Sequence, residues 1–170
     1  DIALTERKKV NQKVDLVMVT AGCQGPSDKN HVPLGLLYVG SALERAGYDV
    51  KIRHLLPEEF EEGLRGIAER NPLWIGLSVL SGMTTLHAMN LSRGIREWAP
   101  DTRIIWAGHH ASAVPDECLE EDCIDFVIHG EGEDTAVEFT DELRNGKAWS
   151  KVLGLGWKDG EGVPVVNPGR

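Results

Sequence analysis

The stretch from Leu73 to Gly82, with the sequence Leu-Trp-Ile-Gly-Leu-Ser-Val-Leu-Ser-Gly, restricts the fold more than any other part of the chain. Its first half, up to Leu77, is almost entirely apolar and follows the breaking pair Asn71-Pro72. A short apolar run between such breaks is typical of a central parallel strand that is covered on both faces. The second half is small and hydroxylic. Because ligands of open α/β sheets bind at the carboxyl ends of the strands, we interpret this stretch as the floor of a binding site.

Strand and helix patterns alternate five times along the 170 residues, which suit one domain. The expected strands are 14–20, 48–54, 73–77, 103–107 and 124–129, and the expected helices are 33–47, 57–70, 84–98, a short one near 115 and one from the turn at 130–133 to about 145. This alternation predicts a doubly wound parallel sheet of the flavodoxin-like or Rossmann-like class, in the order 2-1-3-4-5. Residues 152–157 and 163–166 predict a C-terminal β-hairpin.

The composition excludes several classes of protein. With 27 acidic and 18 basic residues, and a formal net charge of −9, the chain is not suited to nucleic acid or to an anionic membrane. No apolar run approaches the roughly 18 residues of a membrane helix, and the charged start carries no signal peptide. Three scattered cysteines favour free thiols in a reducing, cytoplasmic compartment. Their spacing fits no zinc or iron–sulfur site, so we expect no metal-ligating residues.

Four loops are expected to meet at the carboxyl edge of the sheet, namely 21–32, 78–85, 108–115 and 130–133. Their composition fits none of three common sites of such folds. A receiver domain needs clustered acids after the first strand, and a flavodoxin-type FMN site needs a hydroxyl-rich loop there; the sequence provides neither. A dinucleotide-binding Gly-x-Gly-x-x-Gly motif is also missing, because the turn at 130–133 lacks the third glycine and carries carboxylates.

At these loops the sequence resembles cobalamin-binding domains. Ser78-Val79-Leu80 is similar to their Ser-x-Leu motif, and Gly108-His109 stands at the place of their Gly-Gly pair. Four segments resemble, more specifically, the N-terminal cobalamin-binding domain of cobalamin-dependent radical S-adenosylmethionine enzymes: 33–38, 75–78, 106–112 and 125–133. The resemblance extends over about 14–168, and its last part is similar to the hairpin that precedes the radical barrel of such proteins.

The resemblance implies a cofactor and a division into domains. Cobalamin is expected to bind base-off, with its nucleotide tail between the first and third strands, and without a histidine on cobalt because the chain has no Asp-x-His-x-x-Gly motif. We expect an extension at 1–13, the cobalamin-binding domain at 14–150, and a hairpin or linker at 151–170. The partner would be a radical barrel domain holding S-adenosylmethionine and a [4Fe-4S] cluster. Because the chain starts with Asp1 and lacks Cys-x-x-x-Cys-x-x-Cys, we expect a fragment of a larger enzyme.

The expected cofactor contacts each have a simpler alternative. Serines after the central strand would bind the tail or only cap the next helix. For the acids at 131, 133 and 134 the simpler role is to complement a helix dipole, and this role is compatible with accepting hydrogen bonds from the cofactor. Adjacent histidines on an extended segment would point to opposite faces and share no metal ion. The full set of expected contacts is Leu34, Gly35, Leu36, Ser78, Leu80, Ser81, Gly82, Met83, Gly108, His109, His110, Ser112, Gly130, Glu131, Gly132 and Glu133.

Three functions remain open at this point. The resemblance favours a methylcobalamin-binding domain of a radical S-adenosylmethionine methyltransferase, which alone would bind the cofactor and catalyse nothing. The first alternative is the cobalamin domain of a non-methylating radical enzyme such as an anaerobic cyclase. The second is a flavodoxin-like interaction or signalling module without a cofactor. His31 is a further candidate for approach to cobalt, although a solvated loop histidine is the simpler expectation.

Overall fold

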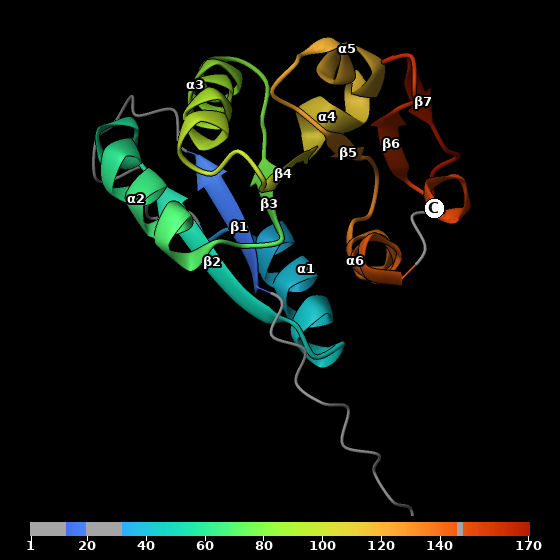
Figure 1. The fold of residues 1–170 in the computed structure, drawn as a ribbon, viewed down its shortest axis with the longest axis horizontal. Helices are drawn as coiled ribbons and strands as arrows, with labels where there is room; N and C mark the ends of the chain where they lie inside the picture. Colours follow the sequence, from blue (N-terminus) through green and yellow to red (C-terminus); the bar gives the residue numbers. More distant parts are fainter. Residues whose placement is uncertain (1–12, 20–31, 146–147) are drawn as a thin grey trace, which may run out of the picture.

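The computed structural model describes residues 13–19, 32–145 and 148–170 (Figure 1). Strands and helices alternate through most of this range, as the sequence predicts. The elements are β1 (Lys13–Val19), α1 (Leu34–Arg45), β2 (Asp49–Leu55), η2 (Pro57–Glu59), α2 (Phe60–Arg70), β3 (Trp74–Ser78), α3 (Met83–Trp98), β4 (Arg103–Ala107), α4 (His109–Ala113), α5 (Pro115–Glu120), β5 (Phe126–Ile128), α6 (Glu133–Asn145), η3 (Trp149–Lys151), β6 (Leu155–Lys158) and β7 (Pro164–Val166).

One sheet of seven strands runs through the described part of the chain in the order β2-β1-β3-β4-β5-β6-β7. The pairs from β2 to β5 are parallel, which confirms the predicted doubly wound order. The C-terminal hairpin is also confirmed, but it is not separate from the sheet. Its first strand pairs antiparallel with β5, with Val127 opposite Gly156, and so covers an edge that would otherwise be open.

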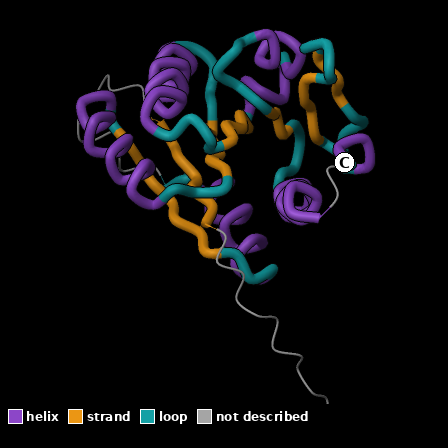
Figure 2. The backbone as a smooth tube through the Cα atoms, in the orientation of Figure 1, coloured by secondary structure: helices purple, strands orange, loops and turns teal. Residues whose placement is uncertain are grey.

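Helices cover both faces of the sheet (Figures 1 and 2). Alternating side chains from each strand enter two separate apolar clusters, one under α2, α3 and α5 and the other under α1 and α6. Trp106 lies in the first cluster and donates its indole N–H to Ser92 Oγ at 3.0 Å. Trp74 lies in the second and donates to Thr140 Oγ1, also at 3.0 Å. Both buried indoles therefore have a hydrogen-bond acceptor, as large amphipathic rings in a core require.

The central position of β3 is confirmed. It pairs with β1 on one side and with β4 on the other, and its residues from Trp74 to Leu77 are buried. Only Ser78, the last residue of the strand, is partly exposed. The transition from apolar to hydroxylic residues in the sequence therefore marks the point where the strand leaves the core.

A buried carboxylate links β1, β2 and α2. Asp15 on β1 is 0% exposed. Its Oδ2 accepts from Arg53 Nε at 2.8 Å, and its Oδ1 accepts from Arg70 Nε at 2.6 Å. Arg70 also donates to the backbone oxygen of Asp49 at 2.8 Å. A buried charge is tolerated only when it is paired in this way, so the network fixes α2 over the edge of the sheet.

None of the helices in the described ranges is long and apolar enough to span a bilayer. Thr20, the expected loop at 21–32 apart from its last residue, and His31 lie outside the described residues.

Candidate functional site

Three turns meet at the carboxyl edge of the sheet, after β3, β4 and β5. Ser78 at the end of β3 lies opposite Ala107 at the end of β4. Beyond this pair, the Val79 N–H donates to the Ala107 carbonyl at 2.8 Å, and the His110 N–H donates to the Val79 carbonyl at 3.1 Å. The turns after β3 and β4 are thus joined by backbone hydrogen bonds outside the strands, which gives this edge a rigid floor.

Gly108 is required by the packing of these two turns. Its φ of +95° lies in the region that favours glycine. A Cβ atom at this position would lie 3.0 Å from the Val79 oxygen, 3.2 Å from the Val79 nitrogen and 3.3 Å from Ser78 Oγ. The backbone of Gly108 therefore lies directly against the end of β3. Position 108 presents backbone rather than side chain at the carboxyl edge.

The serines after β3 do not cap the next helix. The cap residue of α3 is Gly82, which receives no side-chain cap, whereas Thr84 and Thr85 donate their hydroxyls to the Leu80 carbonyl. Ser81 Oγ instead lies 3.3 Å from Nδ1 of His110 across the gap between the two turns. The capping alternative is therefore wrong, and Ser81 remains available to a ligand together with His110.

The histidine pair does not lie on an extended segment, so this expectation was wrong. His109 and His110 are the first two residues of the short helix α4. His109 is exposed, whereas His110 is partly buried, with its ring centroid 6.3 Å from that of Trp106. Within the part of the chain that the structure describes, no three His, Cys, Asp or Glu side chains come together as a metal site.

The turn between β5 and α6 is tied to α4. The Gly130 N–H donates to Ser112 Oγ at 3.0 Å, and Gly130 has a φ of +74°. A Cβ atom at Gly132 would lie 3.3 Å from Cγ2 of Val39, so this glycine permits close packing against α1. Glu133 and its neighbour Asp134 lie in the first turn of α6, where the helix dipole favours acids. The structural alternative therefore holds for these two acids, and Glu131 is exposed beside them.

Large hydrophobic side chains are exposed in the segments that open α1 and α3, and we call this set the apolar rim. Its seven side chains are between 41% and 64% exposed: Val32, Leu34, Leu37, Tyr38, Leu80, Met83 and Leu86. The two segments lie on opposite faces of the sheet, next to two neighbouring strands. Exposed apolar side chains gathered in such segments favour a binding surface there.

The side chains that are exposed at the start of α1 differ from the contacts expected there. Leu36 is 7% exposed and packs into the cluster under α1 and α6, so it belongs to the core. Leu34, Leu37 and Tyr38 share the opposite, exposed face through their spacing of three and four residues. The expected contacts did not include four residues of the rim, namely Leu37, Tyr38, Leu86 and Val32. The helical period of Leu34, Leu37 and Tyr38, out of phase with Leu36 and Leu43, could have revealed the first two.

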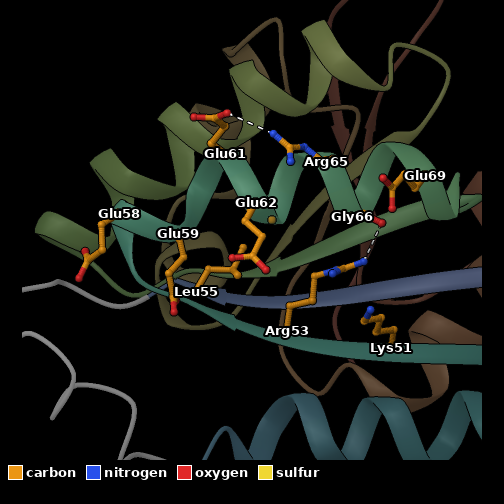
Figure 3. Close-up of a pocket in the computed structure, with 11 residues that line it drawn as sticks. Lys51, Arg53, Leu55, Glu58, Glu59, Glu61, Glu62, Arg65, Gly66 and Glu69 are labelled. Carbon is orange, nitrogen blue, oxygen red and sulfur yellow. Dashed lines mark hydrogen bonds and ion pairs between the residues drawn. The ribbon is translucent and has the colours of Figure 1, made fainter.

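A hollow lies elsewhere, between β2 and α2. This α2–β2 groove has a volume of about 730 Å³ and is lined by Lys51, Arg53, Leu55, Glu58, Glu59, Glu61, Glu62, Gly63, Arg65, Gly66 and Glu69. Figure 3 shows Arg53 directed at the Gly66 carbonyl and Arg65 directed at Glu61. Arg53 is further held by Asp15. The two arginines that line the α2–β2 groove therefore already have partners within the fold.

The two cysteines in the described part of the chain are not suited to chemistry. Cys118 and Cys123 are free and buried. Burial, and to a lesser extent the nearby Glu117 and Glu121, raises the pKa of Cys118 to about 11. Burial likewise raises the pKa of Cys123. Both thiols are therefore protonated at neutral pH and act as small core residues.

Comparison with known proteins assigns this arrangement to a family. The family model of the B12 binding domain matches residues 25–140, which include the turns after β3, β4 and β5. The chain belongs to the B12-binding domain family. The matched residues include the glycine turns at 108 and 130, the serines after β3 and the apolar rim.

Two curated relatives and one solved structure illustrate the family. The cytidylyl-2-hydroxyethylphosphonate methyltransferase of Streptomyces wedmorensis is 25% identical over 155 residues, which are 80% of this chain and 29% of that protein. The anaerobic magnesium-protoporphyrin IX monomethyl ester cyclase of a Synechocystis species is 33% identical over 146 residues, which are 80% of this chain and 28% of that protein. The radical S-adenosylmethionine methyltransferase TsrM of Kitasatospora setae, solved with cobalamin and a [4Fe-4S] cluster bound, superimposes with a TM-score of 0.79 at 20% identity, over 94% of this chain and 29% of that one.

These comparisons support the fold and the family. At 20% identity, the structural likeness to TsrM shows the fold alone. The chain spans less than a third of the length of the relatives that it matches.

Proposed function

We propose that this chain binds cobalamin at the carboxyl edge of the sheet, with the nucleotide tail between the ends of β1 and β3 and the corrin ring over the apolar rim. The observation that carries this proposal is the contact of the Gly108 backbone with Val79 and Ser78, which leaves position 108 without a side chain at the site floor. The apolar rim beside it offers the complementary surface for a large, partly apolar ring.

The expected contacts divide between the two parts of the cofactor. Ser78, Ser81 and His110 would donate or accept hydrogen bonds along the tail, because their polar atoms lie around the joined turns. Gly82 and Gly130, whose Cβ positions meet no atom within 4 Å, leave open space for close approach. Glu131 and Glu133 would accept hydrogen bonds from ribose or amide groups. The rim residues Leu34, Leu80 and Met83, together with Gly35, would contact the corrin.

We further propose that cobalamin binds base-off and without a histidine on cobalt. The sequence has no Asp-x-His-x-x-Gly motif after the first strand. His109 and His110 belong to α4, on the side of the site where the tail is placed. Electron paramagnetic resonance of the cob(II)alamin complex tests this point. A spectrum without nitrogen superhyperfine splitting is expected, and a triplet splitting would contradict it.

When bound, methylcobalamin supplies a methyl group on cobalt; the residues of this chain bind and orient the cofactor. In the whole protein we propose residues 14–150 as the cobalamin domain and 151–170 as the connection to a radical barrel with S-adenosylmethionine and a [4Fe-4S] cluster. The methyltransferase of Streptomyces wedmorensis favours a methylating parent. The cyclase relative, at 33% identity, keeps a non-methylating parent as the second candidate.

The decisive test is a visible absorption titration of the chain with hydroxocobalamin. A stoichiometric shift towards the base-off spectrum is expected for the wild type. Ser78→Tyr should abolish it, because Ser78 packs closely against Gly108 and the larger ring would have to extend from the end of β3 into the space proposed for the tail. Asp101→Tyr adds the same ring at an exposed position before β4, on the opposite edge of the sheet, and should bind normally. A folded wild type that gives no shift would contradict the proposal.

A further inference from the structure

The last four residues of the chain, 167–170, form a strap across the start of α6. The Asn167 side-chain amide donates to the carbonyls of Trp149 and Val152, both at 2.7 Å. The Asn167 N–H donates to the Leu155 carbonyl at 3.0 Å, and the Pro168 carbonyl accepts from the Gly154 N–H at 2.8 Å. The strap is therefore fixed along its length, beside η3 where Figure 1 marks the C terminus.

His129 joins this strap to the end of β5. Its Nε2 lies 2.9 Å from the Asn167 carbonyl, so this nitrogen carries the proton and donates it to that oxygen. A Cβ atom at Gly169 would lie 3.5 Å from Cε1 of the same ring, so the strap also packs on the imidazole. His129 directly precedes Gly130, the first residue of the turn that faces the site. Its side chain thus faces the strap, while the next residue, Gly130, is exposed.

Arg170 makes a second connection, to the first turns of α6. Its Nε donates to Thr135 Oγ1 at 3.1 Å, and its guanidinium forms ion pairs with Glu138 and, at 3.9 Å, with Asp134. Thr135 is fully buried and donates its own hydroxyl to the Leu153 carbonyl at 2.9 Å. The segment from His129 to Thr135 is therefore held at both ends by contacts with the strap.

We infer that the strap at 167–170 is a positioning element for the nucleotide-binding turn at 130–133, and that His129, Asn167 and Arg170 are its positioning residues. This inference rests on the proposed cobalamin site. The turn has two glycines and an exposed glutamate, and the bond from Gly130 to Ser112 links it to α4. Contacts from the strap reduce the conformational freedom that such a turn would otherwise lose on binding.

This role predicts a selective defect. The turn is placed at the nucleotide end, so loosening it weakens binding of hydroxocobalamin but not of diaquocobinamide, which has the same corrin ring and no nucleotide tail. Loss of one or two hydrogen bonds corresponds to an affinity lower by about tenfold. A general loss of stability would weaken binding of both corrinoids alike.

The test measures dissociation constants of both corrinoids for the 170-residue chain and its variants. Asn167→Ala and His129→Leu should each bind hydroxocobalamin about tenfold more weakly and diaquocobinamide within about twofold of wild type. His129→Gln keeps an N–H near the position of Nε2 and should restore most of the affinity. Arg65→Ala removes an exposed arginine and its pair with Glu61 on α2, and should bind both corrinoids as the wild type does.

The outcomes separate this inference from the function on which it rests. A wild-type chain that binds neither corrinoid would overturn both. Wild-type binding with unchanged affinity in the strap variants, or with equal weakening for both corrinoids, would overturn the role of the strap alone. If Asn167→Ala does not fold, Arg170→Ala supplies the same comparison, because it leaves the bonds of Asn167 in place and loosens only the end at Thr135.

Discussion

The carboxyl edge and the α2–β2 groove differ in how their polar groups are used. The groove has a volume of about 730 Å³, yet Arg53 is held by Asp15 and Gly66, and Arg65 is paired with Glu61. At the carboxyl edge, glycine backbone and large apolar side chains are exposed around two neighbouring strands. Volume alone therefore does not identify a site. Exposed apolar surface, which is unfavourable in water, is the better indicator of a binding site.

The largest expected effect on binding comes from Gly108→Val. A valine Cβ would lie 3.0 Å from the Val79 oxygen, and the φ of +95° would be strained. The turns after β3 and β4 must then separate, so hydroxocobalamin affinity should fall by about 100-fold or more, which corresponds to about 2.7 kcal/mol. Gly160→Val is the matched control, because a Cβ there meets no atom within 4 Å. Equal affinities for the two variants would contradict the assigned floor.

The charged network should govern stability and not binding. Asp15→Asn leaves the guanidinium group of Arg53, 10% exposed, without its charged partner. Arg70, 17% exposed, loses one of its two carboxylate partners and keeps Asp49. The free energy of unfolding should fall by about 3–5 kcal/mol, as for other broken buried pairs. Urea denaturation measures this change. Glu61→Gln removes the exposed pair with Arg65 and should cost less than about 0.5 kcal/mol.

If Asp15→Asn destabilised the chain no more than Glu61→Gln, the network would not hold α2 in place. Hydroxocobalamin affinity of the folded Asp15→Asn chain should equal that of wild type. A large loss of affinity would show that the two regions are coupled.

Stability should also fall at high pH because of Cys118, which lies in the cluster under α2, α3 and α5. Its pKa is raised from 9.0 to about 11, so the unfolded chain releases this proton first. Between pH 9 and 11 the free energy of unfolding should decrease by roughly 2–3 kcal/mol from this group. Denaturation of wild type and Cys118→Ala across this range measures the difference. Parallel pH dependences for the two chains would show that the thiol is not desolvated.

The smallest effect is expected from the glutamates of the groove. Glu62 and Glu69 are exposed side chains on α2. Replacing either with glutamine should change the free energy of unfolding by less than about 0.5 kcal/mol. Hydroxocobalamin affinity should stay within about twofold of wild type. A strong loss of affinity in either variant would place the ligand in the groove and remove the contrast between the two regions.

The sequence predicted the order of the sheet because each central strand is a short apolar run between breaking residues. It did not predict α4, because five residues from His109 to Ala113 are too few to show a helical period. The pairing of the hairpin with β5 is a long-range contact that no local pattern records. The site glycines were found through motif resemblance. The positive φ at Gly108 and the packing of Gly132 on Val39 became visible only in three dimensions.

The strap at 167–170 could not be predicted from the sequence for a similar reason. In the sequence, Asn167 is an ordinary residue that follows an expected strand, and His129 is the last residue of another expected strand. Their shared hydrogen bond joins positions 38 residues apart. Leu36 shows the opposite case, since its place in a motif suggested a contact with the cofactor while its helical phase puts it in the core.

Hydrogen–deuterium exchange of the chain, measured with and without hydroxocobalamin, tests the position of the site directly. A cofactor bound at the carboxyl edge should protect 78–86, 108–112 and 129–133 and leave exchange unchanged at 51–69, which cover the α2–β2 groove. Protection confined to 51–69, with the three turns unaffected, would contradict the assignment of the site to the carboxyl edge.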